Sequence, residues 1–369
     1  MKRALDLARQ AAGGVSPRPP VGAVIVQGSE VVGEGATEAR PGRHAEVVAL
    51  DMAGERARGA TMYCTLEPHA HQGTAPPCTE AIINAGISRV VCPIEDPYPA
   101  VSGNGFRQLR AAGVTIDTDL PPEQVRAAEV LIEGFVKHFR TGMPFVTAKF
   151  AMSLDGKIAT RTGESQWVTG PAARSAAHAM RATADTIVTG IGTVLADNPR
   201  LTARAPDGAP TGRPRLRVIV DTRGRLPSEA RLLKEEGNIL WVRGEDVHAT
   251  IEAPNLEAIN LSYNSEGGIN LEHLFKLLGR RDCLNVMVES GGTLMGGLFD
   301  AGLVDKVAAF IAPVVIGGEN APGPVAGHGA GAIRDMLLLD RVEHHIYGSD
   351  ILVTGYVREA IEENVQRHS

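Results

Sequence analysis

The chain has 369 residues, of which 43% are hydrophobic and 22% charged, proportions that are typical of globular proteins and exclude a disordered or collagen-like chain. At roughly 100 to 200 residues per domain, this length predicts two domains. The formal net charge of −6 and the isoelectric point near 6.0 leave no broad basic field for nucleic acid. A small phosphorylated ligand needs only a few local arginines and stays possible.

The four cysteines are too sparse for a disulfide framework, which favours a reducing compartment. Residues 1–14 form a short amphipathic helical pattern without the apolar centre of a signal peptide, and no later apolar run is long enough to span a membrane. We therefore expect a cytoplasmic protein with no membrane partner. Cys64, Cys92 and Cys283 stand in apolar segments and are predicted to be buried small hydrophobes.

Short β-type runs alternate with helical runs up to about residue 140, the pattern of an α/β layer protein. The predicted elements are a hairpin over 21–35 with its turn at Gly28 and Ser29, helices over 44–57, 78–86 and 105–113, and strands over 60–68, 89–96 and 114–118. One long helix over 121–144 begins at a double proline and ends at Gly142 and Pro144. We place the domain boundary there, giving a first domain over 1–142 and a second over 143–369.

The stretch GRHAEVVAL of the first domain places His44 at the mouth of a helix and Glu46 two residues later. In zinc deaminases the histidine of an H-x-E pair binds the metal, and the glutamate moves protons between water and the leaving amine. The pair alone is weak evidence, because most such pairs belong to a solvated helix start.

The deaminase signature continues in TLEPHAHQGTAPPC, residues 65–78, where Cys78 follows two prolines. Such a helix start favours a thiolate and hence a metal bond. His69 stands where a second cysteine is expected, and His71 competes with it as a ligand. Imidazole is as ordinary a zinc ligand as thiolate. It also adds one positive charge to the site, which should make a bound water more acidic and hold the metal less tightly.

The second domain is predicted as a further α/β unit. Its expected elements are strands over 145–156, 186–194, 216–222, 238–243 and 306–318, helices over 170–184 and 270–280, and a Pro/Gly-rich surface loop over 205–215. The stretch VMVESGGTLMGGLF places an apolar strand before a glycine-rich turn and a helix. Glycines let backbone N–H groups approach phosphate oxygens, but this is not the G-x-G-x-x-G fingerprint and is a weak signal alone.

Ordered motifs over nearly the whole chain resemble those of the bifunctional riboflavin biosynthesis deaminase/reductases: SPRPPVGAVIV, HAEVVAL, TLEPHAHQGTAPPC, DPYPAVSGNG, RTGMPFVTAKFAMSLDGKIA, GESQWVT, GTVLADNPRLTAR and VESGGTLMGGLF. The resemblance implies a cytidine-deaminase-like α/β/α layer domain followed by a dihydrofolate-reductase-like α/β domain. It also implies a zinc-dependent deamination of 2,5-diamino-6-(5-phosphoribosylamino)pyrimidin-4(3H)-one, and an NADPH-dependent reduction of the ribosyl chain to a ribityl chain.

The resemblance also implies roles for particular residues. In the first domain the implied zinc ligands are His44, His69 and Cys78, with Glu46 as the catalytic acid and base. In the second domain the implied NADPH-binding residues are Ala151, Trp167, Thr193, Asp197, Gly291, Gly292, Thr293, Leu294, Met295, Gly296 and Gly297, and the implied substrate-binding residues are Ser165, Arg181, Leu201, Arg204 and Glu289.

The departures from the family pattern all fall in the first domain. Family members usually have asparagine at Arg18, cysteine at His69, serine or asparagine at Ala70, and lysine or arginine at or near Thr74. Two interpretations therefore stay open for this domain: a working deaminase, and a retired deaminase kept as a scaffold for a reductase. A nucleic-acid deaminase is a third possibility, which the acidic charge and the attached reductase domain disfavour.

Other interpretations stay open in the second domain. Trp167 alone would be assigned to the core, and Asp197 to a loop cap. Arg181 and Arg204 are candidates for the substrate phosphate, because a guanidinium binds oxygens two at a time. Lys149 and Asp155 would position the sugar or relay a proton, or form a structural ion pair. The family also implies a homo-oligomer assembled through this domain.

Overall fold

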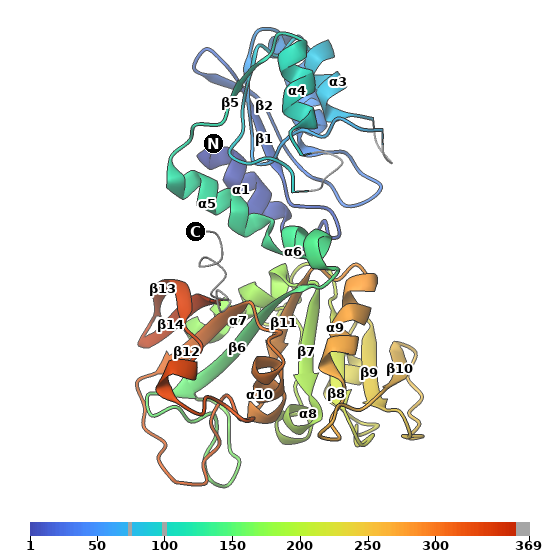
Figure 1. Ribbon diagram of the computed structural model, residues 1–369, viewed down its shortest axis with the longest axis vertical. Coiled ribbons are helices and arrows are strands. Elements are labelled where there is room, and N and C mark those ends of the chain that lie inside the picture. The colour runs from blue at the N-terminus through green and yellow to red at the C-terminus, as the bar shows by residue number, and fades with distance from the viewer. Residues whose placement is uncertain (73–75, 98–101, 359–369) are drawn as a thin grey trace, which may run out of the picture. The chain divides into compact units, whose positions relative to one another are not determined.

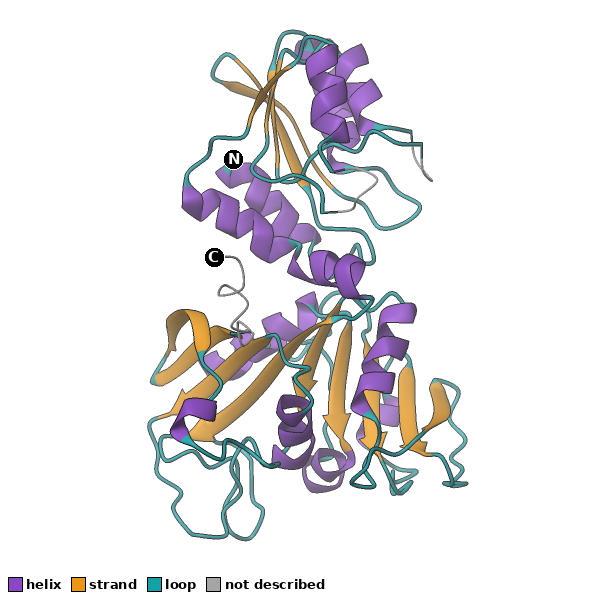
Figure 2. Cartoon of the chain, viewed as in Figure 1, coloured by secondary structure: helices purple, strands orange, loops and turns teal. Residues whose placement is uncertain are grey.

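The computed structural model describes residues 1–72, 76–97 and 102–358 (Figure 1). The chain forms two compact units, one made of Met1–Met143 with Asp282–Leu284, the other of Pro144–Arg281 with the described residues from Asn285 onward. Each unit combines a sheet with helices (Figure 2). The predicted α/β class is confirmed for both.

A five-stranded sheet forms the centre of the first unit. Its strands are β1 (Gly22–Gln27), β2 (Glu30–Ala36), β3 (Thr61–Cys64), β4 (Arg89–Val91) and β5 (Thr115–Asp117), in the order β2-β1-β3-β4-β5. Strand β1 is antiparallel to β2 and β3, whereas β3, β4 and β5 are parallel. The predicted hairpin is confirmed, and its turn uses the left-handed backbone of Gly28 (φ 61°).

Helices cover both faces of this sheet, as the alternation of side chains along β1 requires. They are α1 (Lys2–Ala11), α2 (Ala45–Ala53), α3 (Cys78–Asn84), α4 (Asn104–Ala111), α5 (Pro122–Leu131) and α6 (Glu133–Thr141), with a 3₁₀ turn η1 (Gly54–Ala57). Ala23 and Ile25 belong to the main core of the unit, whereas Val24 packs on the other side against Ala4 and Leu7 of α1. The predicted α/β/α layering is confirmed.

The prediction of one helix over 121–144 is wrong. The chain leaves helical dihedral angles at Ile132 (φ −115°, ψ 12°), which separates α5 from α6. Ile132 is itself buried in the main core together with Phe135.

Glycines in β2 fix the position of α2. A Cβ atom at Gly35 would lie 2.6 Å from the carbonyl oxygen of Ala45, and one at Gly33 would lie 2.2 Å from that of Ala49. Real Cβ atoms do not approach a carbonyl oxygen so closely, so only glycine lets α2 pack this tightly against β2. The contact holds the first turn of α2, and with it His44 and Glu46, against the sheet.

A nine-stranded sheet forms the centre of the second unit. Its strands are β6 (Phe145–Ser153), β7 (Thr186–Gly190), β8 (Leu216–Asp221), β9 (Ile239–Gly244), β10 (Leu256–Leu261), β11 (Asn285–Glu289), β12 (Lys306–Ala312), β13 (Leu339–Tyr347) and β14 (Asp350–Val357). The order is β10-β9-β8-β7-β11-β6-β12-β14-β13, parallel except that β14 is antiparallel to both of its neighbours. Strand β13 is an edge strand.

The strand order reverses between β7 and β11, where ligands of open α/β sheets usually bind beyond the carboxyl ends of the strands. The helices are α7 (Pro171–Thr183), α8 (Ile191–Asp197), α9 (Leu271–Arg280) and α10 (Gly292–Asp300), with 3₁₀ turns η2 (Arg231–Lys234) and η3 (Ile333–Asp335). The predicted strand over 186–194 is wrong in its second half, because the extended backbone of Gly190 (φ −90°, ψ 154°) caps α8. Strands β10, β13 and β14 were not predicted.

The described cysteines, Cys64, Cys78, Cys92 and Cys283, are all free and buried. The prediction of buried small side chains at Cys64, Cys92 and Cys283 is confirmed. Among the described residues, no helix has both the length and the apolar character needed to cross a membrane.

Candidate active sites

The first site begins at the start of α2. His44 is the N-cap residue, with extended backbone (φ −80°, ψ 156°), and its carbonyl accepts the N–H of Val48 at 3.1 Å. Glu46 lies in the first helical turn and is only 4% exposed. The tight contact of α2 with β2 therefore places the His44 imidazole at the N-terminus of the helix and the Glu46 carboxyl group on its buried face.

The loop after β3 brings the other two candidate ligands to His44. The backbone N–H of Glu67 donates to the carbonyl of Ile94 at 3.2 Å, and the carbonyl of His69 accepts the N–H of Thr79 at 3.3 Å. Cys78 is the first residue of α3, directly after Pro77 at the N-cap. The loop is thus tied both to the segment that follows β4 and to the helix that carries the cysteine.

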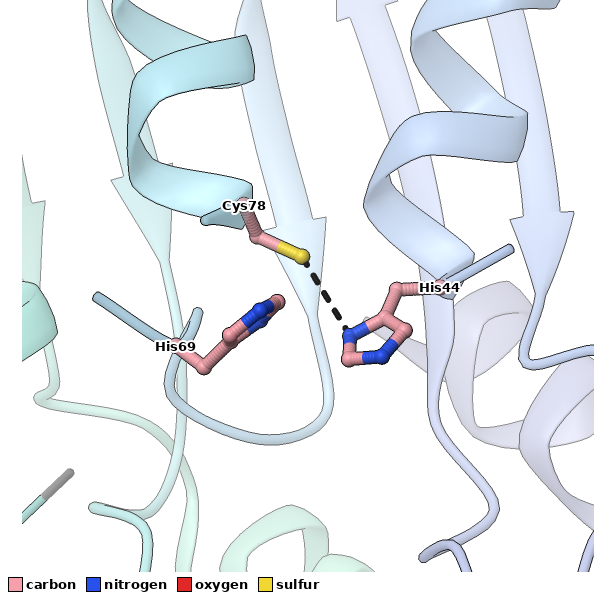
Figure 3. Close-up of side chains that lie close together, drawn as sticks. All are labelled: His44, His69 and Cys78. Carbon is pink, nitrogen blue, oxygen red and sulfur yellow. Dashed lines mark hydrogen bonds between the residues drawn. The ribbon is translucent and has the colours of Figure 1, made fainter. Parts of the chain in front are cut away.

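His44, His69 and Cys78 converge, although they come from different segments (Figure 3). Their candidate ligand atoms all lie within 4.8 Å of one another, and the Sγ atom of Cys78 is 3.4 Å from Nδ1 of His44. A tetrahedral zinc ion with ordinary bond lengths holds nitrogen and sulfur roughly 3.5 Å apart. The three side chains therefore fit a zinc ion. His71 is not one of this group, and its ring centroid lies 5.5 Å from that of His69.

Burial sets the protonation of these groups. It lowers the pKa of His44 to about 4, with help from the charge of Arg18, so the imidazole is neutral and able to bind a metal. Burial and the nearby Glu46 carboxylate raise the pKa of the Cys78 thiol, an effect that outweighs the expected benefit of a helix start. Burial also raises the pKa of Glu46 to about 7, the range in which a carboxyl group both takes and gives protons.

The substituted positions of this site have different surroundings. Arg18 is 8% exposed, and its Nη1 donates to the carbonyls of Gly42 at 2.6 Å and Glu38 at 3.3 Å, in the loop that leads to His44. Ala70 is half-buried directly after His69. Thr74 lies outside the described residues.

The second site is organised around Glu289, the last residue of β11. Arg181 of α7 donates to both of its carboxylate oxygens, at 2.6 Å from Nε and 2.7 Å from Nη2, and Nζ of Lys149 lies 3.4 Å away. Burial alone would raise the pKa of Glu289, but the charges of Arg181 and Lys149 overcome it and hold the pKa well below its usual range. Two of the predicted substrate-binding residues are thus one buried ion pair.

Two further pairs of predicted residues are in contact. The Ser165 hydroxyl donates to the carboxylate of Asp197 at the end of α8. The backbone N–H of Gly291, the N-cap residue of α10, donates to the hydroxyl of Thr193 at 3.2 Å. The second bond joins the starts of α8 and α10 across the point where the strand order reverses.

Trp167 and Asp155 resolve two of the open interpretations. Trp167 is 69% exposed, with the Arg174 guanidinium 4.8 Å from its ring centroid, so it is not a core aromatic. Asp155 accepts the hydroxyl of Ser153 at 2.6 Å and the N–H groups of Ile316 and Gly317 at 3.0 and 2.7 Å. These bonds lower the pKa of Asp155 to about 2 and give the carboxylate a structural task.

The residues of the glycine-rich segment 291–297 differ in exposure and in packing. Gly291 and Gly292 stand at the start of α10, and Thr293 beside them is exposed, as a phosphate site requires. Leu294 and Met295 are buried in the core. A Cβ atom at Gly296 would lie 2.2 Å from the carbonyl oxygen of Ala326, so this glycine serves close packing. A Cβ atom at Gly297 would lie 3.3 Å from Cδ1 of Leu271.

Three predicted residues remain. Ala151 is half-buried in β6, and Leu201 is buried with a left-handed backbone (φ 55°). Arg204 is half-buried, and within the described part of the chain its Nε has no hydrogen-bond partner. Burial and the neighbouring charge of Arg181 lower the pKa of Arg204. An arginine in repulsive contact with other cations is a suitable anion-binding group.

Sequence analysis missed His178, whose Nδ1 lies 3.1 Å from the carbonyl oxygen of Thr202 and 3.4 Å from Nη1 of Arg181. Burial, with Arg181 and Arg204 beside it, lowers its pKa to about 4. Its surroundings in the sequence, an alanine-rich helix, gave no signal. Sequence analysis assigned no role to Glu67, whose buried carboxylate accepts the backbone N–H groups of Asp96, Gly103 and Phe106.

Comparison with known proteins matches each of the two units to a family model. Residues 144–353 match the family model described as the RibD C-terminal domain, and residues 1–94 match the cytidine and deoxycytidylate deaminase zinc-binding region. The riboflavin biosynthesis protein RibD of Bacillus amyloliquefaciens is 38% identical over 364 residues, covering 97% of this chain and 96% of that protein. The Escherichia coli protein of the same name is 39% identical over 328 residues, covering 86% and 88%.

Solved structures give the same result. A diaminohydroxyphosphoribosylaminopyrimidine deaminase/5-amino-6-(5-phosphoribosylamino)uracil reductase from Thermotoga maritima superposes with a TM-score of 0.84 at 33% identity, covering 97% of each chain. Acinetobacter baumannii RibD gives a TM-score of 0.81 at 32% identity, covering 97% of this chain and 98% of that one. The resemblance expected from the motifs is confirmed, and the chain belongs to the RibD family of bifunctional riboflavin biosynthesis deaminase/reductases.

Proposed function

We propose that the chain catalyses two consecutive reactions of riboflavin biosynthesis, a deamination assigned to residues 1–142 and a reduction assigned to 143–369. The proposed first substrate is 2,5-diamino-6-(5-phosphoribosylamino)pyrimidin-4(3H)-one, and the proposed second reaction converts its deaminated ribosyl chain to a ribityl chain. The observation that carries the proposal is the convergence of His44, His69 and Cys78 beside the buried Glu46.

In the deaminase unit, His44, His69 and Cys78 would hold the zinc ion, which supplies a Lewis acid that activates water. Glu46 would take a proton from the attacking water, whose oxygen would bond to the carbon that carries the amine. It would return a proton to the amine nitrogen as the carbon–nitrogen bond breaks and ammonia leaves. Its buried position, which raises its pKa to about 7, lets one carboxyl group perform both transfers near neutral pH.

In the reductase unit, NADPH supplies the hydride, and the protein has to orient it and the substrate. We assign the cofactor phosphates to the start of α10, where Gly291 and Gly292 present backbone N–H groups. Trp167 offers an exposed aromatic surface to the cofactor, beside the hydrogen-bonded pair of Ser165 and Asp197.

Arg204 is the better candidate for the substrate phosphate. The guanidinium of Arg181 already donates two hydrogen bonds to Glu289, so these two N–H groups are not available to a phosphate. Arg204 retains unused donors, and its nearest charged neighbours include the cations Arg181 and Arg200. An incoming phosphate relieves that repulsion. The pair of Arg181 and Glu289 then has the separate task of orienting the sugar chain.

The alternative is a reductase with a degenerate deaminase unit, because His69 replaces the usual cysteine. The test is ammonia release from the diaminopyrimidinone substrate without NADPH, with zinc measured on the same sample. Stoichiometric zinc, and ammonia release that Glu46→Gln reduces by about 10²- to 10⁴-fold, support the bifunctional enzyme. NADPH oxidation with the deaminated substrate but no ammonia release from the first substrate identifies a reductase alone.

We also propose a cytoplasmic homo-oligomer assembled through the edge strand β13. Its central residues are exposed along their length, with Ile346 78% exposed, and the preceding segment adds Ile333 at 81%. An edge strand with unpaired backbone groups and exposed apolar side chains is a ready pairing surface. Ile346→Asp should convert the oligomer to monomers in analytical ultracentrifugation, whereas the same change at the polar edge position His344 should have a smaller effect. An unchanged oligomer in Ile346→Asp refutes this interface.

A further inference from the structure

Glu67 is a buried carboxylate next to the metal-binding loop. It is 3% exposed, and its oxygens accept three backbone N–H groups: Oε2 accepts those of Asp96 and Gly103, and Oε1 accepts that of Phe106, each at 3.0 Å. Phe106 lies in the first turn of α4. A single side chain therefore binds the segment that follows β4 and the start of α4 to the loop that follows β3.

The attachment is close to His69. Only Pro68 separates Glu67 from His69, and a Cβ atom at Gly105 would lie 2.0 Å from the carbonyl oxygen of Pro68. The first turn of α4 thus presses directly on the residue before the ligand. On its other side, the His69 carbonyl accepts the N–H of Thr79, in the helix that carries Cys78.

We propose that Glu67 is a positioning residue of the deaminase site, which holds His69 at coordination distance from His44 and Cys78 by joining its loop to α4. This inference rests on the proposed zinc deaminase. A rigid backbone on both sides of Pro68 leaves the His69 imidazole little freedom. Loss of the Glu67 carboxylate releases three N–H groups and lets the loop move away from α3.

Glu67→Gln is the variant that tests the inference, because it keeps the side-chain volume while it removes the charge and turns an amide NH₂ toward backbone donors. The matched control is Glu30→Gln, whose carboxylate is exposed and bonds Arg56 on the surface of the same unit. NADPH oxidation by the second unit of each variant reports on the rest of the chain.

The readouts are zinc affinity, measured by competition with a chromophoric chelator, and the ligand-field spectrum of the Co²⁺-substituted protein. We expect Glu67→Gln to bind zinc about 10- to 100-fold more weakly, the usual effect of losing a group that orients a ligand. Its Co²⁺ spectrum should differ from that of the wild type, while Glu30→Gln matches the wild type in both. A wild-type spectrum and zinc affinity in Glu67→Gln overturn the inference.

A measurement on the unaltered protein covers the case in which Glu67→Gln does not fold. If Glu67 couples the metal loop to α4, removal of zinc by a chelator should accelerate amide hydrogen exchange at Gly103 and Phe106. Unchanged exchange there shows that Glu67 only caps α4 and overturns the inference. Failure of the proposed function looks different, because the wild-type protein then binds no zinc at all.

Discussion

The two sites of this chain are built in opposite ways. The deaminase site takes His44, His69 and Cys78 from three segments within residues 44–78, whereas the reductase site joins Lys149, Arg181 and Glu289 from more distant positions. The difference extends to charge. Burial keeps the groups of the first site neutral, whereas the second site holds a carboxylate and two cations that neutralise one another.

The comparison shows which site depends on a ligand for its organisation. In the first site the favourable charge interactions require a cation, because Glu46 and Cys78 repel each other when both are ionised. In the second site the protein supplies its own counterions at the carboxyl end of β11, so the site is preorganised by a salt bridge. Perturbing each in turn should therefore affect metal binding in one unit and folding stability in the other.

The largest expected effect is that of Glu289→Gln. The change leaves the Arg181 guanidinium buried with no carboxylate, so the second unit should lose about 3 to 5 kcal/mol of unfolding free energy along with NADPH oxidation. Urea denaturation followed by tryptophan fluorescence measures the loss, since Trp167 and Trp241 both lie in this unit.

The control for that variant is Glu272→Gln, which removes an exposed partner of Lys276 in the same unit and should change stability by less than about 1 kcal/mol. Ammonia release by Glu289→Gln should stay at the wild-type level. A variant that loses both activities together would contradict the separation of the two sites.

The next effect concerns the unusual ligand. His69→Ala should weaken zinc binding by at least about 10- to 100-fold, which is the usual effect of losing a group that only orients a metal ligand. His69→Cys should bind zinc more tightly than the wild type, because a thiolate removes the additional positive charge. Equilibrium dialysis against zinc buffers measures both. Equal zinc affinity in wild type and His69→Ala would exclude His69 as a ligand, and His71→Ala is the matched control.

Sequence patterns predicted the local parts of this molecule best. The hairpin at Gly28, the α/β/α layering and the ligand group of His44, His69 and Cys78 all lie within short stretches whose spacing carries the signal. The break at Ile132 was missed because a helix pattern continues through it, and tertiary packing of that residue decides the outcome.

The second site was less predictable for a physical reason. Nothing in the local sequence of Glu289 shows that Arg181 will neutralise it, because the pairing arises only when α7 packs beside β11. The exposure of Trp167 could not be predicted from its residue type either, since tryptophan side chains are largely buried in most folded proteins. Strand β13 lacks the alternation that marks a half-buried strand, because most of its residues are exposed.

A moderate effect is expected at Trp167. Trp167→Leu should weaken NADPH binding by about tenfold, because it removes an exposed ring that is available for stacking. NADPH should quench the fluorescence of Trp167 and leave that of the fully buried Trp241 unchanged. Trp241→Phe provides the protein in which Trp167 is the sole tryptophan. Absence of quenching in that protein would remove Trp167 from the cofactor site.

The most gradual expected effects are opposite pH dependences of stability, set by Glu289 and Glu46. The pKa of Glu289 in the folded protein lies below its unfolded value, so its stabilising contribution is present above about pH 4.5 and declines as the pH falls further. The pKa of Glu46 is raised to about 7, so in chelator-treated protein the contribution of this carboxyl group favours the folded state at low pH and is lost as the pH rises from 4.5 through 7. His44 and His178, whose pKa values are lowered to about 4, contribute in the opposite direction, so the Glu46 contribution is obtained as a difference from Glu46→Gln.

Each dependence is limited to about 1.4 kcal/mol per pH unit, the value for one proton. Differential scanning calorimetry from pH 3.5 to pH 8 should show the stability of the wild type relative to Glu46→Gln declining between about pH 4.5 and 7, because glutamine does not titrate. Restoring zinc should reduce this decline, since a nearby cation favours the ionised carboxylate and lowers its pKa. A zinc-free profile that is the same in wild type and Glu46→Gln would show that Glu46 keeps an ordinary pKa, and with it that burial does not prepare this carboxyl group for proton transfer.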